Sequence, residues 1–331
     1  MTGHAGGAAT RPAHTSGPLV SVILPTCDRP DGLVGALESV LAQDYGHLEA
    51  VVVDDASTVP AESALASLAE DSRVRITRLP RRTGAAGARN AGLAVASADL
   101  VAFIDDDDRW LPHKVRRQVE AFESRPELGL VTCDYFVVDE NAGESTVVYR
   151  GPPAFTAAQV QWTNLPGSFS FVMARRSALG DELRLDETFP SVEDWDLWLR
   201  CARMAPVEVV REPLCHHVVH GGLSRPSSER LGMELFLQKH ADTMSPVCRA
   251  YVAGHLRMYR GTGWRKKMAV MQGMATPSPR ASAILVMEQG LRVAARRRRD
   301  PGLVTRTLAT IVGRDGRAAV TRRRRTEPEE T

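Results

Sequence analysis

Residues 100–108 read LVAFIDDDD, an apolar run that ends in four consecutive aspartates. A short apolar run bounded by polar residues is typical of a buried strand. Such a strand would deliver the carboxylates of Asp105 to Asp108 into one cleft. Two ionised carboxylates ~6 Å apart repel by roughly 3 kcal/mol at an effective dielectric of ~20, so the cluster requires a cation or full solvation. We therefore expect a divalent metal, Mn²⁺ or Mg²⁺, at this strand end.

This strand belongs to a longer α/β pattern. From residue 19 to about 134, β-branched runs alternate with helical spacing, which is typical of a parallel sheet with crossover helices. The expected strands are Leu19–Pro25, Leu48–Asp54, Arg73–Leu79, Asp99–Asp105 and Gly129–Tyr135, and the expected helices between them are Pro30–Ala42, Ala85–Ala96 and Leu111–Glu123. The later part predicts short strands at Ser145–Tyr149 and Ser168–Ala174, and helices at Glu193–Met204, 228–243 and 281–295.

The composition is that of an ordinary globular protein. The chain has 331 residues, of which 43% are hydrophobic, enough for one large core with an appended region. Its five cysteines are scattered and have no CxxC spacing, which argues against a disulfide framework or zinc module and favours a reducing cytoplasm. Residues 1–17 lack an apolar core, so they predict a disordered leader and not a signal peptide. No run is long enough to predict a membrane span.

Charge is concentrated at the C-terminal end. Residues 291–331 hold 12 arginines and 5 acidic residues, a net charge of +7 within a chain whose total is +2. We hypothesise that this tail, with Arg296 to Arg299 after an apolar helical face, makes peripheral contact with the inner face of an anionic membrane. The other interpretation is a solvated, partly disordered end. No nucleic acid is expected as a partner.

Three polar clusters follow expected strands and should meet at one edge of the sheet. They are Pro25-Thr26-Cys27-Asp28, Asp54-Asp55-Ala56-Ser57 and the four aspartates. Asp54 or Asp55 can accept a base N–H or a ribose hydroxyl, and the aspartates can hold a metal against a diphosphate. Arg89 and Asn90 can bracket the nucleotide. This is the pattern of a nucleotide-diphosphate pocket.

Several motifs together resemble one enzyme family. They are SVILPTCDRPDGLVGALESVLAQDY at 21–45, VVVDDAS at 51–57, GAAGARNAGLAVASADLVAFIDDDDRWLPHK at 84–114, EDWDLW at 193–198 and HGGLS at 220–224. This set is similar to family 2 glycosyltransferases, which have the GT-A fold, an α/β fold with a mostly parallel central sheet flanked by helices. The resemblance implies inverting transfer from a nucleoside-diphosphate sugar, with a metal on the diphosphate.

The resemblance also implies roles for single residues. Asp55 would meet the base, Asp105 or Asp106 the ribose, and Asp107 the metal, while Asp194 would be the general base. Together with the strand-end clusters, the expected nucleotide-binding set is Pro25, Thr26, Asp28, Asp54, Asp55, Arg89, Asn90, Asp105 and Asp106.

Other side chains near these positions have alternative roles. Flanking Trp195 and Trp198 would desolvate Asp194 and raise its pKa toward that of a useful base, with Glu193 and Asp196 as competitors. Glu193 and Trp195 are also acceptor-side candidates, and His220 is a candidate second metal ligand. Asp108 is expected to cap the helix after Trp110. Zinc at Cys215, His216 and His217 is disfavoured by their spacing.

Two residues of this chain depart from the pattern of the family that it resembles. Cys27 stands where many relatives have an aromatic residue, and Asp28 where they often have Asn.

Other functions compete with this resemblance. A nicotinamide-dependent enzyme is excluded because Gly84, Gly87 and Gly92 do not form a GxGxxG pattern after the first strand. A metal-dependent nucleotidyltransferase and a non-catalytic nucleotide-sugar-binding relative stay open. The expected acceptor is a cell-envelope glycan, a lipid-linked sugar or a small molecule.

The expected organisation has four parts. Residues 1–17 form the leader, 18–136 the nucleotide-sugar-binding half and 137–225 the acceptor-binding and catalytic half. Residues 226–331 form a helical C-terminal region that ends in the basic, partly disordered tail.

Overall fold

The computed structural model describes residues 17–139, 144–148, 153–218, 226–259 and 322–323. Its strands are β1 (Val20–Thr26), β2 (Leu48–Asp54), β3 (Val74–Arg78), β4 (Leu100–Phe103), β5 (Arg109–Trp110), β6 (Leu130–Asp139), β7 (Glu144–Val148), β8 (Ala154–Phe155), β9 (Met173–Arg175), β10 (Val207–Val218) and β11 (Arg322–Arg323).

Its α-helices are α1 (Pro30–Leu41), α2 (Ala61–Leu65), α3 (Gly84–Val95), α4 (Lys114–Ser124), α5 (Ala157–Val160), α6 (Arg176–Leu179), α7 (Glu193–Met204), α8 (Pro226–His240) and α9 (Pro246–Tyr259). Short 3₁₀ turns are η1 (Ala66–Glu70), η2 (Phe169–Phe171) and η3 (Gly180–Glu182). In the described residues, no helix is long and apolar enough to cross a bilayer.

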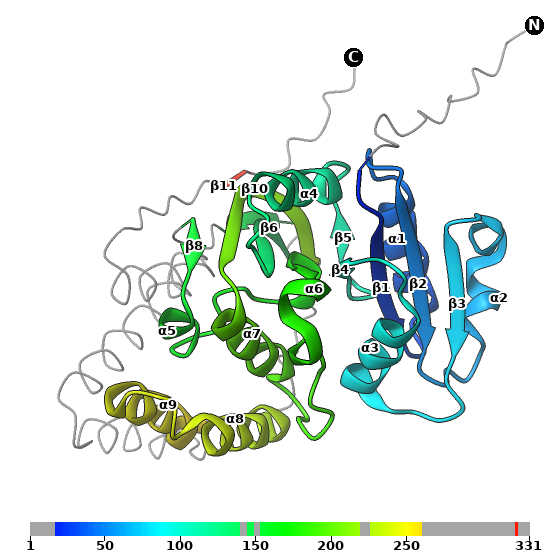
Figure 1. Cartoon of the computed structure of the whole chain (residues 1–331). Helices are drawn as coiled ribbons and strands as arrows, with labels where there is room; N and C mark the ends of the chain where they lie inside the picture. Colours follow the sequence, from blue (N-terminus) through cyan, green and yellow to red (C-terminus); the bar gives the residue numbers. More distant parts are fainter. Residues whose placement is uncertain (1–16, 140–143, 149–152, 219–225, 260–321, 324–331) are drawn as a thin grey trace, which may run out of the picture.

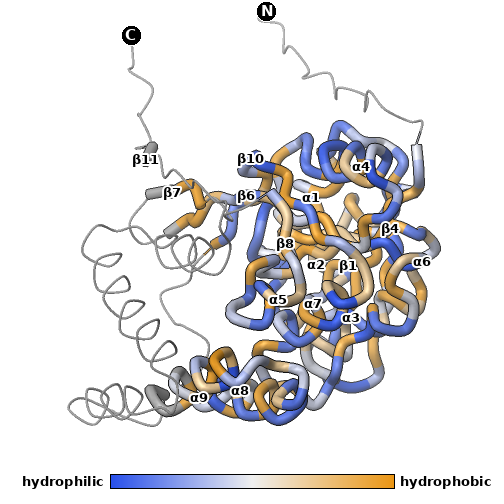
Figure 2. The backbone as a smooth tube through the Cα atoms, turned by 60° about the vertical axis from the view of Figure 1, so that its left-hand side comes forward, coloured by the Kyte–Doolittle hydropathy of each residue, from blue (hydrophilic) through white to orange (hydrophobic). Residues whose placement is uncertain are grey.

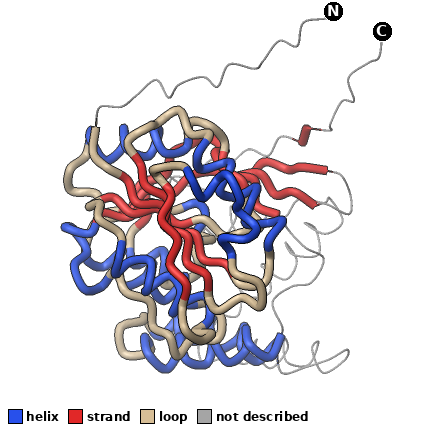
Figure 3. Tube along the Cα trace, turned by 90° about the vertical axis from the view of Figure 1, so that its right-hand side faces the viewer, coloured by secondary structure: helices blue, strands red, loops and turns tan. Residues whose placement is uncertain are grey.

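One mixed, largely parallel sheet organises the molecule (Figure 1). Its strand order is β11-β7-β6-β9-β4-β1-β2-β3, and β10 pairs with β5, β6 and β8. The pairs β1–β2, β1–β4, β2–β3 and β6–β10 are parallel. Helices cover both faces of the sheet (Figure 3). This confirms the predicted α/β class.

The central strands are continuous apolar runs because both faces of the sheet are covered. All seven residues of β1 are buried, as are all four of β4. On α1, Pro30 occupies the first turn, where its missing N–H is not needed, and Leu33, Leu37 and Val40 pack inward. The predicted helices Pro30–Ala42, Ala85–Ala96, Leu111–Glu123 and Glu193–Met204 correspond to α1, α3, α4 and α7.

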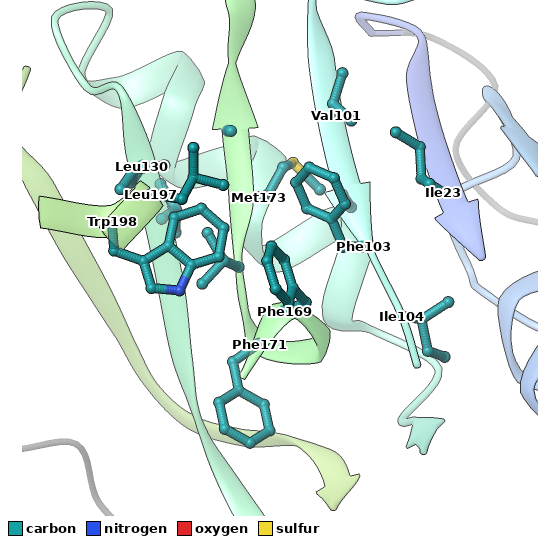
Figure 4. Packing of buried hydrophobic residues seen from close by; sticks show 14 of the residues in the cluster. Ile23, Val101, Phe103, Ile104, Leu130, Phe169, Phe171, Met173, Leu197 and Trp198 are labelled. Atoms are coloured by element: carbon teal, nitrogen blue, oxygen red, sulfur yellow. The ribbon is translucent and has the colours of Figure 1, made fainter. Parts of the chain in front are cut away.

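An aromatic cluster joins the two halves of the core (Figure 4). Phe103 on β4 lies 5.4 Å from Phe169, ring centroid to centroid, and 6.3 Å from Trp198 on α7. Phe169 and Trp198 are 5.2 Å apart. Aromatic pairs at such separations contribute about 0.5–1.5 kcal/mol beyond their buried area. The end of β4 and the middle of α7 are therefore held in one packed unit.

The predicted strand at Ser168–Ala174 is wrong in its first half. The Ser168 hydroxyl accepts a hydrogen bond from the Ser170 N–H and bends the chain into the η2 turn, and a strand begins only at Met173. Alternating phenylalanines imitate a strand pattern here. The new strand, β9, runs antiparallel between β4 and β6. These two predicted strands remain parallel to each other but are separated by a strand from the later part of the chain.

The two helices after residue 225 belong to the main core. Met233 and Phe236 from α8, and Cys248, Tyr251 and Val252 from α9, are buried in the same apolar cluster as the sheet. In Figure 2 both helices alternate between hydrophilic and hydrophobic colour, as expected for helices with one buried face. Predicted helix 228–243 corresponds to α8, while predicted helix 281–295 lies outside the described residues.

Candidate active site

The three predicted polar clusters do meet at one edge of the sheet. Thr26 at the end of β1 pairs in register with Asp54 at the end of β2, and its hydroxyl donates to Asp106 Oδ2 at 2.8 Å, just beyond β4. A cavity of about 510 Å³ opens at this edge. Its lining residues are Pro25, Thr26, Cys27, Arg29, Asp55, Arg82, Gly84, Ala85, Ala88, Arg89, Asp105, Asp106 and Asp107.

The neighbouring aspartates 54 and 55 have different roles. Asp54 is 1% exposed, and its carboxylate accepts from Ser57 N–H, Ala61 N–H and Arg78. Burial raises the pKa of Asp54, but the hydrogen bonds from Ala61 and Ser57 outweigh it and hold that pKa below its usual value. This carboxylate shapes the loop after β2 and does not line the cavity, so a contact between Asp54 and a nucleotide stays a prediction.

Asp55 lines the cavity and shapes its wall. Its Oδ1 accepts from the Thr83 N–H at 2.7 Å, and its Oδ2 accepts from the Gly84 N–H at 2.8 Å. Gly84 has a φ of +80°, a conformation that favours glycine. The carboxylate thus ties the entrance of α3 to the end of β2. Its contact with a base stays a prediction.

Asp28 and Asn90 do not line this cavity. Asp28, at a φ of 55°, pairs with Arg82 and accepts from the Thr58 N–H, and it faces an adjacent cavity of about 380 Å³. Asn90 donates to the Leu185 carbonyl at 2.9 Å and accepts from the Leu185 N–H at 2.9 Å. Both residues hold loops together, so their predicted nucleotide contacts are not supported.

The four aspartates after β4 are unequal. Asp105 pairs with Arg89, and its N–H donates to Ser170 Oγ at 2.9 Å. Asp106 accepts from Thr26, and burial raises its pKa. The side chain of Asp107 is 23% exposed and faces the cavity. These three carboxylates therefore line one wall at different depths.

Asp108 points away from the cavity, and its predicted role as a helix cap is wrong. Its carboxylate is 0% exposed and lies 3.0 Å from His217 Nδ1, and it accepts from the Val218 N–H at 3.1 Å. The residue that precedes α4 is His113, which makes no side-chain cap. Asp108 instead fastens the end of β10 beside the carboxylates.

Arg29 is a site residue that the sequence analysis missed. Its NH1 lies 3.1 Å from Asp106 Oδ1 and 2.7 Å from Asp107 Oδ2. A single guanidinium thus offsets the repulsion between two neighbouring carboxylates. Its position between Asp28 and the helix-starting Pro30 was the available signal.

Arg89 links the two sides of the site. It is 5% exposed on α3, and its guanidinium lies 3.8 Å over the Phe169 ring. NH2 pairs with Asp105, and NH1 lies 3.5 Å from Glu193 Oε1. Within the described residues its Nε and NH1 make no hydrogen bond. Buried polar atoms of this kind usually have a partner, so they suit a ligand in the cavity.

Asp194 lies in the first turn of α7, beside Glu193. Asn164 Nδ2 donates to its Oδ2 at 2.7 Å, and the Trp195 N–H donates to its Oδ1 at 2.7 Å. Burial, and secondarily the negative charge of Glu193, raise the pKa of Asp194 from 3.8 to about 7. A carboxylate with this pKa is suited to accept a proton near neutral pH.

The residues after Asp194 are structural. The Trp195 indole is buried and donates to the Val160 carbonyl at 2.6 Å, so its predicted acceptor-side role is not supported. Asp196 is fully buried against Arg200, Lys239 and His240, which removes it as a competing base.

The cavity fits a divalent metal bound together with a phosphate. Among the described residues no group of three or more His, Cys, Asp or Glu side chains could hold a metal by itself. Mg²⁺ in nucleotide sites is usually held by one or two carboxylates plus substrate phosphates, which Asp107 and its neighbours satisfy. The expectation against zinc at Cys215 and His216 stays a prediction, and His220 lies outside the described residues.

The strand order and this carboxylate-lined edge define the class: a GT-A glycosyltransferase fold. The same fold is seen in S. aureus TarS 1-349 in complex with UDP, with a TM-score of 0.61, 17% identity and coverage of 88% of this chain and 90% of that one. Mannosyltransferase PcManGT from Pyrobaculum calidifontis, in complex with GDP-Man and Mn²⁺, matches with a TM-score of 0.57, 19% identity and coverage of 90% and 87%.

Sequence comparisons define the family. The family model described as glycosyl transferase family 2 matches residues 21–183. Succinoglycan biosynthesis protein ExoO of Rhizobium meliloti (strain 1021) is 30% identical over 273 residues, or 78% of this chain and 73% of that protein. The UDP-Glc:alpha-D-GlcNAc-diphosphoundecaprenol beta-1,3-glucosyltransferase WfaP of Escherichia coli is 29% identical, over 55% and 69%. This chain belongs to glycosyl transferase family 2 and is a glycosyltransferase.

Proposed function

We propose that this enzyme transfers a sugar, with inversion, from a nucleoside-diphosphate sugar to a hydroxyl of a cell-envelope acceptor. The observation that carries the proposal is Asp194, whose pKa of about 7 suits a general base, placed across Arg89 from the carboxylate-lined cavity. Related proteins named for UDP-Glc transfer and succinoglycan biosynthesis support the substrate class. A lipid-linked sugar and a small molecule remain alternative acceptors.

Donor binding uses the cavity at the carboxyl ends of β1, β2 and β4. Pro25 and Thr26 line it, and Asp55 and Asp105 would accept hydrogen bonds from the base and from the ribose hydroxyls. Asp107, with His220 expected from the sequence, would hold Mn²⁺ or Mg²⁺, which supplies positive charge for the leaving diphosphate.

The transfer step is a single displacement. The acceptor oxygen attacks the anomeric carbon as the bond to the diphosphate oxygen breaks, and that oxygen keeps the bonding electron pair. Asp194 takes the acceptor proton on a carboxylate oxygen, while Asn164 holds the carboxylate by its other oxygen. Arg89 contacts Asp105 on the donor side and Glu193 on the acceptor side, and so fixes the position of one side relative to the other.

Two substitutions test this assignment. We expect Asp107→Asn to lose metal-dependent donor binding, and Asp194→Asn to keep donor binding but lose transfer by roughly 10²–10⁴-fold. Thermal shift with UDP-Glc, UDP-GlcNAc and GDP-Man, each with and without Mn²⁺, measures binding, and release of nucleoside diphosphate measures turnover. Wild-type transfer in either variant would refute its assigned role. Binding without any turnover in the wild type would favour a non-catalytic relative.

The basic C-terminal segment supports a peripheral membrane contact. Residues 291–331 carry a net charge of +7, and each basic residue near an anionic surface contributes about 1 kcal/mol. Flotation with vesicles of anionic and of neutral lipid compares the full chain with a chain that ends at residue 259. We expect only the full chain to float, and only with anionic vesicles; equal flotation of both chains would remove the contact.

A further inference from the structure

The turn that precedes Asp194 has an unusual backbone conformation. Val192 has a φ of +59° and a ψ of +19°, the left-handed region. A β-branched residue is rarely found there, since its side chain clashes with its own backbone. Such conformations persist only where the surroundings impose them. Val192 is the residue immediately before α7, so its conformation sets the direction in which Glu193 and Asp194 leave the turn.

Helix α8 is in close contact with this turn. A Cβ atom placed on Gly232 would clash with the Ser191 carbonyl oxygen and lie 2.7 Å from Val192 Cγ2. The first of these is a backbone atom and cannot swing away like a side chain. Gly232 itself lies within a helix, where alanine is normally favoured over glycine. Close approach of the two backbones is therefore the reason for glycine at this position.

Further contacts hold α8 to the next residues of α7. The Phe236 ring stacks on Trp195 with centroids 4.2 Å apart. His240 Nε2 lies 2.8 Å from Asp196 Oδ1, and Lys239 Nζ lies 3.1 Å from Asp196 Oδ2. The first turn of α7 is thus divided: its first two residues serve the site, and its next two are fixed by α8.

We propose that α8 is a positioning element for the catalytic base, and that Gly232 is its main positioning residue. By its close contact with Ser191 and Val192, Gly232 keeps the turn in its left-handed conformation and keeps the Asp194 carboxylate at Asn164. This inference rests on the proposed function. It assigns a role in transfer to a helix that neither contacts the cavity nor falls within the segment matched by the family model.

A shift of the turn would act on transfer more than on donor binding. The donor cavity is lined by residues from β1, α3 and the ends of β2 and β4, and none of these comes from α7 or α8. Asp194, in contrast, moves with the start of α7. A misplacement of about 1 Å at a reacting group can cost ~10²-fold in rate.

The direct test is Gly232→Ala in the full chain, with Leu231→Ala as the matched control. Leu231 is the neighbouring residue on α8 and is 44% exposed. We use the nucleotide sugar that gives the largest thermal shift with Mn²⁺ and follow nucleoside diphosphate release. Gly232→Ala should lower kcat at least ~30-fold while changing the donor KM less than about twofold, and Leu231→Ala should leave both unchanged.

The pH profile separates positioning from a general loss of structure. The groups that face Asp194 are Glu193 on α7, Arg89 on α3 and Asn164 before η2. If Gly232→Ala moves the carboxylate relative to these groups, the acid limb of kcat/KM shifts by about half a pH unit or more. A loss of active molecules alone would lower the rate without moving that limb.

A second variant covers the case in which Gly232→Ala does not fold. Val192→Gly tolerates the left-handed conformation and removes the side chain on which Gly232 presses. It should fold with little change in Tm, bind the nucleoside diphosphate normally and lose kcat at least ~5-fold, because the turn is no longer held in one conformation. Wild-type kcat in Val192→Gly, or in a folded Gly232→Ala, would overturn the proposal.

The activities of the three variants distinguish a failure of this inference from a failure of the proposed function. If Asp194→Asn retains wild-type turnover, the assignment of the base is wrong. If Asp194→Asn is inactive while both turn variants are fully active, only the role of α8 is wrong.

Discussion

At the scale of single residues, Asp194 predicts the pH dependence of the enzyme. Its pKa is raised to about 7 by burial and by Glu193, and a general base works only when deprotonated. We expect kcat/KM to rise with pH up to about 7 and then level off, as measured by nucleoside diphosphate release between pH 5 and 9. An acid limb that stays near pH 4 would contradict this.

The same raised pKa predicts that Asp194 lowers stability at neutral and alkaline pH. The folded state favours the protonated form of the Asp194 carboxyl. The contribution of this group to the unfolding free energy is therefore fully present below about pH 4 and is lost as the pH rises through 7. Asp194→Asn should therefore raise the unfolding free energy at pH 8 by at least ~1 kcal/mol. Urea unfolding at pH 8 measures the gain, with the exposed Asp181→Asn as control. No gain would mean that Asp194 is well solvated.

Arg29 predicts competition with the metal. Its guanidinium pairs with Asp106 and Asp107, so a divalent cation must displace it or share those carboxylates. Arg29→Ala should tighten Mn²⁺ binding in the absence of nucleotide by roughly 3–10-fold, measured as free Mn²⁺ by electron paramagnetic resonance. Arg75→Ala is the control, because Arg75 is similarly exposed and pairs with Glu49. Equal Mn²⁺ affinity in all three proteins would show that Arg29 does not compete.

Individual carboxylate roles are where sequence reasoning was least accurate. The meeting of the three strand ends follows from parallel pairing alone, so it could be predicted. Whether Asp54 or Asp55 faces the cavity depends on the turn after β2, where Asp54 is held by Ser57 and Ala61. Asp108 was misassigned because its partner, His217, lies 109 residues away on β10. Tertiary contacts of this kind leave no local signal.

At the scale of elements, helix α4 brings a lysine into the core. Lys114 is 0% exposed, its Nζ donates to Gln118 Oε1 at 2.7 Å, and it lies 3.8 Å over the Trp110 ring. Burial lowers its pKa from 10.5 to about 8. Between pH 8 and 10.5 the unfolded chain therefore binds more protons than the folded one, and stability should rise with pH by about 3 kcal/mol from this group.

Lys114→Met tests that contribution. The variant removes the titrating amine and also the donor to Gln118, so its stability at pH 7 reflects two opposing changes. The difference in unfolding free energy between wild type and variant should nevertheless move in favour of the wild type as pH rises from 8 to 10.5. Urea unfolding at these two pH values measures it, and a constant difference would show that the amine is not desolvated.

Helices and strands were predicted best where their own residues show a clear hydrophobic pattern. α1 and α7 have continuous apolar faces, and β1 and β4 are buried runs. β10 was missed because Glu208, Arg211 and Glu212 interrupt its apolar residues, and register shifts divide its pairing with β6. Its place in the sheet comes from long-range pairing, which a local pattern does not encode.

At the scale of the whole molecule, α8 and α9 are expected to be essential for folding. The two helices and the connection between them bury Met233, Phe236, Met244, Cys248, Tyr251, Val252 and Leu256 in the common core. A fully buried side chain of this kind stabilises by about 1.5–3 kcal/mol, so seven of them approach or exceed the ~5–15 kcal/mol net stability of a typical protein.

Two truncations test this expectation. A chain that ends at residue 225 should show no cooperative thermal transition and no nucleoside diphosphate binding. A chain that ends at Tyr259 keeps every described element except β11, so it should unfold cooperatively and bind as the full chain does. The comparison shows whether α8 and α9 are an integral part of the fold or an appended region. Cooperative unfolding of the shorter chain, at the Tm of the longer one, would show that residues 18–225 fold without the two helices.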